Sequence, residues 1–291
     1  MKLSAYRALA RLALRGALTV RARCRIARER ALCVFDAAEQ LGVEVRFAAI
    51  NSLGGMYERQ SNVILLPSER PRGRQAFTCA HELGHWYFGH GTRLDRLLEI
   101  DEAGASEPEE LLASMFAGYL LMPARAVETA FARRQWNPSS ATPFDIYVVA
   151  TQLGVGYETL VRHLQLSLDL IPDERARELL KTNPRAIRAS LLDDTPAGSL
   201  LIVADSAWGD VPIDLQVGDV AIVPKGARVE GKNVRPFTST RCGEAFEAYA
   251  PGISRVESDD AAWASFIRVA RKHYSGRSVF RHLADPDDFS P

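Results

Sequence analysis

The chain has 291 residues, with 36 basic (Lys and Arg) and 36 acidic side chains, and therefore carries no formal net charge at pH 7. Hydrophobic residues make up 47% and charged residues 25%, which is typical of a globular protein and excludes a disordered or collagen-like chain. No apolar run approaches the roughly 20 residues that a membrane-spanning helix needs, so we expect no membrane partner. Because the charges balance overall, any binding to nucleic acid depends on a local basic patch.

Such a patch lies near the start of the chain. Residues 1–34 hold nine basic side chains and one acidic side chain, Glu29. The basic residues are Lys2, Arg7, Arg11, Arg15, Arg21, Arg23, Arg25, Arg28 and Arg30. They are suited to bind phosphate groups, but a solvated basic helix face explains them equally well.

The four cysteines are scattered along the chain and form no C-x-x-C pair. They are Cys24, Cys33, Cys79 and Cys242. This usage favours a reducing, cytoplasmic compartment over a disulfide-bonded secreted fold.

Hydrophobic periodicity predicts the elements of the first part of the chain. They are, in order, helices over residues 3–18 and 22–41, a strand over 43–50, a hairpin of 56–59 and 62–66, and a helix over 73–88. Gly42 is expected to end the second helix, and Gly54 with Gly55 to form a turn before the hairpin.

The helix over residues 73–88 contains His81-Glu82-Leu83-Gly84-His85, an H-E-x-x-H motif. Positions i and i+4 of a helix lie on one face, so His81 and His85 can both offer a ring nitrogen to one metal ion. Glu82 is placed where a carboxylate can hold a metal-bound water and accept its proton. The apolar flanks of the motif, and the room that Gly84 leaves for close packing, favour a buried active-site helix over a chance match.

After His90 an acidic, loop-like stretch leads to a helix that starts near Pro108, with Ser106 as its N-cap. Beyond it we expect a helix over residues 123–134, a helix-turn-helix-like unit over 143–166, a charged helix over 172–180, strands at 199–204, 219–224 and 244–249, and a last helix over 259–274. The second helix of the helix-turn-helix-like unit offers few polar side chains to DNA bases, which favours a packing role over DNA reading.

These elements predict an α+β fold in which a small sheet lies beside the metal-bearing helix. The stretch from Asp193 to Pro196 is expected to be a domain boundary. We divide the chain into a domain with the metal motif (1–136), a helix-turn-helix-like unit with a linker (137–194) and a β-rich domain (195–291).

Two separated motifs resemble the bacterial ImmA/IrrE metallopeptidases. The family pattern F-T-x-A-H-E-x-x-H is matched by residues 77–85, and the later pattern F-A-x-x-L-L-M-P by residues 116–123. The likeness covers about residues 40–135 closely and extends more weakly to the tail of the family's radiation-response branch. It implies a zincin-like zinc metallopeptidase domain at residues 1–136 and a GAF-like sensor domain at residues 195–291.

The resemblance implies a zinc-dependent endopeptidase in which His81 and His85 bind Zn²⁺ and Glu82 is the general base. It also implies that the substrate is a partner helix-turn-helix transcriptional repressor, cut in response to DNA damage or phage stress. The members found in CBASS antiphage systems further imply activation by single-stranded DNA, for which the N-terminal patch and a second basic cluster are candidates. That cluster comprises Arg268, Arg271, Lys272, His273, Arg277 and Arg281.

The resemblance implies a third zinc ligand on the helix that precedes F-A-x-x-L-L-M-P, where the commoner family pattern is E-x-E-A-N-x-F-A. Here Leu112 replaces the second Glu and Ser114 replaces the Asn, whereas the first Glu is kept as Glu110, as in the radiation-response branch. We therefore expect Glu110 to be the third ligand, with Glu109 and Asp101 as alternatives. A solvated acid near a helix N-terminus is the non-functional interpretation of Glu110.

His90 also matches the family pattern, but it is half a helical turn out of phase with His81. We expect it to form a hydrogen bond near the site rather than to bind the metal. The residue that stabilises the oxyanion is left open between Tyr57, Tyr119 and His90.

Arg241-Cys242-Gly243 resembles the cysteine switch of matrix metalloprotease propeptides. Cys242 is therefore a candidate inhibitory ligand that occupies the open zinc position and holds the enzyme latent. A half-buried thiol in a strand or turn is the alternative. Cys79, two residues before His81, is expected in the core.

A second function stays open: a non-catalytic, metal-binding regulator that binds DNA or senses a ligand on a degenerate metallopeptidase fold. Glu82 favours the enzyme, because a purely structural metal site needs no general base. The absence of a Glu at position 112 is the feature that favours the regulator.

Overall fold

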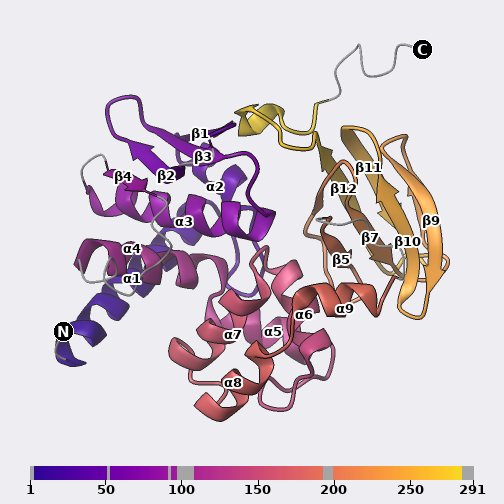
Figure 1. The fold of residues 1–291 in the computed structure, drawn as a ribbon, viewed down its shortest axis with the longest axis horizontal. Coiled ribbons are helices and arrows are strands. Elements are labelled where there is room, and N and C mark those ends of the chain that lie inside the picture. Colours follow the sequence, from indigo (N-terminus) through magenta and orange to yellow (C-terminus); the bar gives the residue numbers. More distant parts are fainter. Residues whose placement is uncertain (1–2, 51–52, 91–92, 97–107, 193–198, 284–291) are drawn as a thin grey trace. The chain divides into compact units, whose positions relative to one another are not determined.

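The computed structural model describes residues 3–50, 53–90, 93–96, 108–192 and 199–283. The chain forms two compact units (Figure 1). The first comprises Met1–Glu128, Leu153–Val155 and Ser275–Val279, and the second comprises Thr129–Gln152, Gly156–Tyr274 and Phe280–Pro291. The predicted boundary at residues 193–196 lies outside the described residues.

The first unit is built on a five-stranded sheet with the strand order β13-β1-β3-β2-β4. The strands are β1 (Glu44–Ala48), β2 (Leu53–Glu58), β3 (Val63–Pro67), β4 (Arg93–Arg96) and β13 (Gly276–Arg277). β1 and β3 run parallel, and the other neighbours run antiparallel. Val45, Ile64 and Leu66 are fully buried on this sheet. The strand predicted over residues 43–50 and the hairpin that follows it are confirmed.

The glycine pair Gly54-Gly55 does not form the predicted turn. Both residues lie in β2, where the pairing with β4 shifts register between Leu53 and Gly55. Glycine inside a strand marks either such an irregularity or a close approach of another group.

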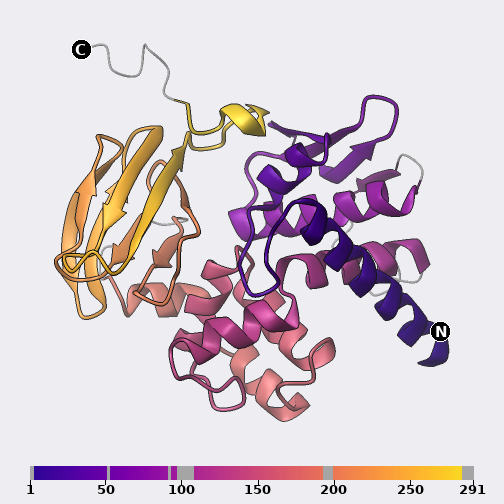
Figure 2. The same ribbon diagram turned by 180° about the vertical axis from the view of Figure 1, so that it is seen from behind.

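Helix α3 (Arg72–Phe88) lies between the sheet and α4 (Pro108–Leu121), and α1 (Leu3–Arg23) packs against α4 (Figures 1 and 2). The helix predicted over residues 73–88 and the one predicted from Pro108 are both confirmed. Ser106, the predicted N-cap, lies outside the described residues. α5 (Ala124–Ala132) follows α4 directly and agrees with the helix predicted there.

The single helix predicted over residues 22–41 is wrong, because a loop separates α1 from α2 (Val34–Gln40). The Arg21 side chain explains the loop. Its guanidinium donates to the carbonyls of Leu120 and Ala27, both at 2.8 Å, and to that of Arg30. Loop carbonyls bonded in this way need no helical partner. Burial lowers the pKa of Arg21 to about 10, so it stays charged at neutral pH.

α6 (Pro143–Gln152) and α7 (Tyr157–Leu166) belong to the second unit and have the predicted helix-turn-helix layout. Gly154 lies in the turn between them, at φ 70°. α8 (Asp173–Leu180) and α9 (Pro184–Ala189) complete the helical part. On α7, His163 is buried and Arg162 forms an ion pair with Glu158 at 2.7 Å. The burial of His163 agrees with a packing role for α7, whereas the Arg162–Glu158 pair is exposed to solvent.

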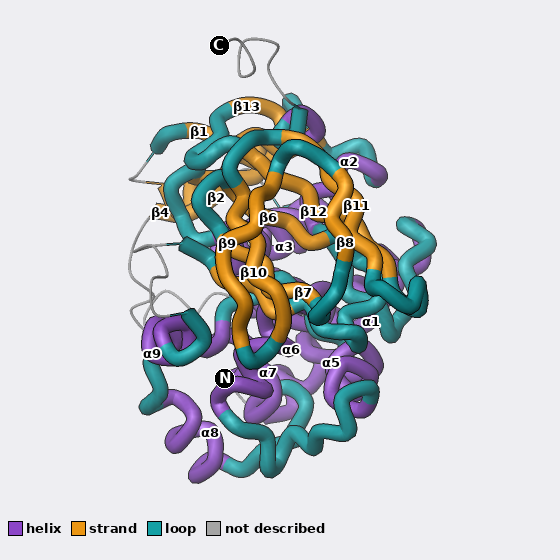
Figure 3. Tube along the Cα trace, turned by 90° about the vertical axis from the view of Figure 1, so that its right-hand side faces the viewer, coloured by secondary structure: helices purple, strands orange, loops and turns teal. Residues whose placement is uncertain are grey.

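Strands β5 to β12 form two four-stranded sheets with the orders β5-β7-β10-β9 and β6-β12-β11-β8 (Figure 3). The strands are β5 (Leu201–Val203), β6 (Ile213–Gln216), β7 (Val220–Val223), β8 (Arg228–Glu230), β9 (Val234–Thr240), β10 (Gly243–Ala248), β11 (Gly252–Glu257) and β12 (Ala264–Ala270). One apolar core joins Ile202 and Ala221 of the first sheet to Ile213, Val256 and Ile267 of the second. Two sheets over one core make a β-sandwich. The α+β class and the β-rich C-terminal part are therefore confirmed.

The last helix, predicted over residues 259–274, is wrong, because this stretch contains β12. Ser265, Ile267 and Val269 are buried, whereas Phe266 between them is 51% exposed. That period of two is the alternation of a strand, and pairing with β11 and β6 fixes it. Among the described residues after 199, the helical structure is one short 3-10 turn, Ser278–Phe280.

Buried polar contacts hold the helices of the second unit to its sandwich. The Arg134 guanidinium donates two hydrogen bonds of 2.7 Å to the Asp205 carboxylate. The Tyr147 hydroxyl donates to the Leu201 carbonyl at 2.5 Å. Paired charges and satisfied donors of this kind fix the relative placement of the elements that carry them. In the part of the chain that the structure describes, every helix is too short or too polar to span a bilayer.

Candidate metal centre

The residues of the H-E-x-x-H motif lie on α3, and two of them are almost fully buried. Glu82 and His85 are each 1% exposed, and the His81 side chain is 12% exposed. The helix ends at Gly89, which adopts the left-handed conformation (φ 72°) that allows a tight C-terminal cap. The motif thus lies in the last turns of a helix that packs between the sheet and α4.

Helix α4 approaches α3 closely at Gly84. A Cβ placed on Gly84 would lie 3.1 Å from the Ala113 Cα and 3.1 Å from the Phe116 ring. A Cβ at this distance would force α4 to move by a few tenths of an ångström, so glycine allows the closer approach. Glu110 lies about one helical turn before Ala113, so the crossing brings its carboxylate to the histidines of α3.

Three possible ligand atoms converge at this crossing. His81 Nε2 lies 3.1 Å from His85 Nε2 and 3.2 Å from Glu110 Oε2, and the third distance, His85 Nε2 to Glu110 Oε2, is 3.4 Å. Donor atoms at three corners of a tetrahedron around zinc, with bonds of about 2.0–2.1 Å, lie about 3.3–3.4 Å apart. The triangle therefore has the size that a single zinc-like ion requires, and two imidazoles with one carboxylate are a donor set that fits it.

Hydrogen bonds with His81, the larger cause, and with His85 hold the pKa of the Glu110 carboxyl well below its usual range. Glu110 is therefore an ionised carboxylate near pH 7, the form that binds a metal cation.

Residues around the triangle contact the other ring nitrogens of the two histidines. His90 Nδ1 lies 2.9 Å from His85 Nδ1, and the Ser114 hydroxyl oxygen lies 3.2 Å from His81 Nδ1. The cap at Gly89 turns the chain back, and the His90 backbone N–H donates to the His85 carbonyl at 3.0 Å. His90 thus lies beside His85 and outside the converging triangle, as its helical phase predicted.

Glu82 lies next to strand β2. A Cβ on Gly55 would come within 2.3 Å of Thr78 and 3.1 Å of Glu82 Oε1. The absence of a side chain at Gly55 is what lets the backbone of β2 pass directly beside the Glu82 carboxylate.

The sequence profile of the peptidase M78 family, described as the IrrE N-terminal-like domain, matches residues 38–165. These residues belong to the ImmA/IrrE family. The family is one of metallopeptidases, and the match covers the H-E-x-x-H motif and Glu110. This M78 domain extends from α2 through the helix-turn-helix layout of α6 and α7.

A comparison with curated proteins finds no significant match. Among solved structures, a transcriptional regulator of Mycobacterium tuberculosis is similar over 55% of this chain and 46% of its own, with 18% identity and a TM-score of 0.35. The aligned part thus spans less than half of that regulator. A likeness this distant indicates neither a shared fold nor a shared function.

Of the three residues predicted as third metal ligand, Glu110 is the one that the structure places beside both histidines. Among the described residues, the group of His, Cys, Asp and Glu side chains whose ligand atoms lie within 4.8 Å of one another is His81, His85 and Glu110. Glu109 is not in that group, and Asp101 lies outside the described residues.

The predicted oxyanion donors have contacts of their own. The Tyr57 hydroxyl donates to Asn62 Oδ1 at 3.1 Å, and His90 contacts His85. Burial raises the pKa of Tyr119, so its hydroxyl is protonated near pH 7. The role of each stays a prediction.

Cys242 lies in the turn between β9 and β10, where its backbone N–H donates to Thr240 Oγ1 at 3.1 Å. Its side chain is half-buried, and it belongs to the second unit, whereas the triangle belongs to the first. Cys79 is fully buried in the core of the first unit, as predicted.

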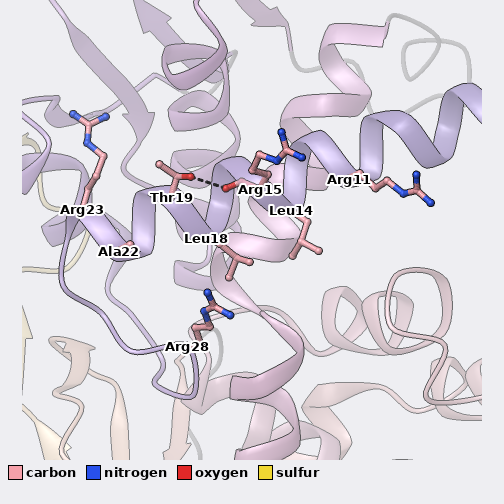
Figure 4. A pocket seen from close by; sticks show the side chains of 8 residues that line it. All are labelled: Arg11, Leu14, Arg15, Leu18, Thr19, Ala22, Arg23 and Arg28. Atoms are coloured by element: carbon pink, nitrogen blue, oxygen red, sulfur yellow. Dashed lines mark hydrogen bonds between the residues drawn. The ribbon is translucent and has the colours of Figure 1, made fainter.

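The basic side chains of α1 line an open groove of about 840 Å³ in the first unit (Figure 4). Its lining residues are Arg11, Leu14, Arg15, Leu18, Thr19, Ala22, Arg23 and Arg28. All charged residues of this lining are arginines, which have the charge and hydrogen-bonding geometry for phosphate groups. The sequence predicted a basic patch near the start of the chain. It did not predict that Arg21, one of the nine basic residues there, is buried.

In the second basic cluster, Arg268, Arg277 and Arg281 each have an acidic neighbour. The Arg268 guanidinium donates to the Asp214 carboxylate at 2.8 Å, and the buried Arg281 lies 3.8 Å from the same carboxylate. Arg277 lies 3.2 Å from Glu44. These acidic neighbours lower the net positive charge around the three arginines. The α1 groove, whose lining holds four arginines, is the surface that we consider for phosphate binding.

Proposed function

We propose that this protein is a zinc-dependent endopeptidase in the cytoplasm that cleaves a partner transcriptional repressor. The observation that carries the proposal is the triangle of His81 Nε2, His85 Nε2 and Glu110 Oε2, with edges of 3.1–3.4 Å, on the helix that also bears the buried Glu82. We assign the peptidase domain to residues 1–136.

His81, His85 and Glu110 would hold the zinc ion. When bound, zinc supplies Lewis acidity, which polarises the scissile carbonyl and makes a water molecule more acidic. Three protein ligands leave a tetrahedral position open for that chemistry.

Glu82 would act as the general base. Its carboxylate accepts a proton from the attacking water and later donates it to the nitrogen of the departing amine. The burial of Glu82 beside the β2 backbone excludes bulk water, which strengthens the electrostatic effect of the site on the reacting groups.

The substrate and the signal are finer parts of the same proposal. We take the substrate to be a helix-turn-helix repressor, cut in response to DNA damage or phage stress, as in the antiphage members of the family. Single-stranded DNA is the proposed activator, and the arginines of the α1 groove are the groups that would bind its phosphates.

Two regulatory elements complete the proposal. The predicted domain of residues 195–291, which contains the sandwich of β5 to β12, would act as a GAF-like sensor domain, with residues 137–194 as the unit that connects it to the peptidase. The Cys242 thiolate would occupy the open zinc position in the latent enzyme. What supports this role is that the thiol is only half-buried, in the turn between β9 and β10.

The deciding experiment incubates the zinc-loaded full chain with the helix-turn-helix repressor encoded next to it and follows fragments by mass spectrometry. Glu82→Gln should keep zinc at the wild-type stoichiometry and lower the cleavage rate by about 10²- to 10⁴-fold, the usual contribution of a general base. A variant that cuts at the wild-type rate would contradict the mechanism. A wild-type protein that binds zinc and cuts nothing would favour the alternative, a non-catalytic metal-binding regulator.

A further inference from the structure

Helix α4 contacts both nitrogens of the His81 ring. Glu110 Oε2 lies 3.2 Å from His81 Nε2, and Ser114 Oγ lies 3.2 Å from His81 Nδ1. Glu110 and Ser114 are four residues apart, so they lie on the same face of the helix, one turn from each other. The imidazole is therefore held between two successive turns of α4.

The two nitrogens of a neutral imidazole have opposite roles, because one carries the proton and the other carries the lone pair. A metal ion can bind only the nitrogen with the lone pair. When a metal ion is bound, a hydroxyl oxygen at Nδ1 can accept a hydrogen bond from Nδ1–H, which leaves the Nε2 lone pair for the metal at the point where Glu110 and His85 converge. A hydroxyl that accepts from Nδ1–H thus favours the tautomer in which Nε2 can bind the metal.

His85 has the same arrangement with a different partner. Its Nδ1 lies 2.9 Å from His90 Nδ1, and its Nε2 belongs to the converging triangle. Both histidines therefore have Nδ1 in contact with a neighbouring polar atom and Nε2 directed at the common point. The partner of His85 is His90, which lies five residues later, just past the end of α3. The partner of His81 is Ser114, which lies on another helix, α4.

We propose that Ser114 is a positioning residue that holds His81 with its proton on Nδ1 and its Nε2 lone pair directed at the metal. This inference rests on the proposed zinc site and adds a residue to it that contacts neither the metal nor the substrate. The alternative is that position 114 needs only a small side chain beside α3. Ser114→Ala distinguishes the two, because alanine keeps the small size and removes the hydroxyl.

The test measures the zinc affinity of apo-protein by competition with a chromophoric chelator, and the visible spectrum of the cobalt(II)-substituted protein. Ser114→Ala should weaken zinc binding by about 10- to 100-fold, the usual effect of removing a hydrogen-bond partner of a metal ligand, and should change the cobalt spectrum. The melting temperature of the apo-protein should not change. Ser114→Thr retains the hydroxyl and should restore binding to near the wild-type value.

The outcomes separate this inference from the proposed function. If Ser114→Ala binds zinc as tightly as the wild type while His81→Ala does not, the zinc site stands and the role of Ser114 is wrong. If the wild type binds no zinc, or if His81→Ala binds it equally well, both the site and the role of Ser114 are wrong. If Ser114→Ala lowers the melting temperature of the apo-protein and Ser114→Thr does not restore zinc affinity, position 114 is a packing position and the inference fails.

Discussion

Gly84 of α3 lies against Ala113 of α4, so that a Cβ on the glycine would be 3.1 Å from the Ala113 Cα. This contact sets the separation of the two helices. His81 and His85 flank Gly84 on α3, and Glu110 precedes Ala113 on α4. The distance between the two backbones at this point therefore controls the size of the triangle.

Replacing Gly84 with alanine should disturb both stability and metal binding. The added methyl group meets a backbone atom, which cannot rotate away, so α4 must move outward by a few tenths of an ångström. We expect a loss of about 1–3 kcal/mol in the free energy of unfolding, as for other overpacked cores, together with weaker zinc binding. Urea unfolding and chelator competition measure the two effects. Gly156→Ala is the control, since its Cβ would meet only Thr159 Oγ1 at 3.4 Å, and little change in either quantity is expected.

Glu110→Gln should remove most of the zinc affinity, because the neutral amide lacks the charge that a carboxylate offers to the cation. Glu109→Gln is a matched control one position away on the same helix, and it should bind zinc like the wild type. Metal content after dialysis against a weak chelator, measured by atomic absorption, decides between the two. Equal zinc loss from both variants, or loss from Glu109→Gln alone, would overturn the assignment of Glu110.

Cys242→Ser should release the enzyme from latency if the thiolate occupies the open zinc position. The variant should then cleave the repressor without an activator, at a rate that the wild type reaches only when activated. In the cobalt(II)-substituted protein, the sulfur-to-metal charge-transfer band of the latent wild type should be absent from the variant. Cys33→Ser, which removes another half-buried thiol, should leave basal cleavage unchanged. Identical basal rates and spectra in wild type and Cys242→Ser would exclude the switch.

The double variant Arg11→Glu and Arg15→Glu should no longer be stimulated by single-stranded DNA in repressor cleavage. Its zinc affinity should equal that of the wild type. Reversal of two charges in the groove replaces phosphate attraction by repulsion, and the affinity for an oligonucleotide should fall at least tenfold at low salt. Fluorescence anisotropy with a labelled oligothymidylate measures the affinity. Arg125→Glu changes an exposed arginine of α5 outside the groove, where the side chain is 77% exposed, and serves as the control. Wild-type stimulation of the double variant would place the DNA site elsewhere.

Local pattern was sufficient to predict the helix over residues 73–88, the hairpin before it and the start of α4 at Pro108. In each case the side chains that repeat at the helical or strand period are those that the fold buries, so sequence neighbours decide the conformation. The same is true of His81, Glu82 and His85, whose shared placement needs only one regular helix.

Where contacts come from distant parts of the chain, the local pattern was not sufficient. Residues 264–270 suit an amphipathic helix by composition, but pairing with β6 and β11 makes them a strand. The Arg21 guanidinium closes a loop where periodicity predicted a continuous helix, and the Asp214 carboxylate pairs with Arg268, which the sequence presented only as part of a basic cluster.

The sequence by itself determined which two histidines share a helix face and which glutamate follows the first of them. Only the tertiary structure decided that Glu110 Oε2 completes the triangle and that Ser114 contacts the far side of His81. The physical reason is the α3–α4 crossing at Gly84. A helix fixes the spacing of its own residues, whereas the distance between two helices depends on side-chain volume where they touch.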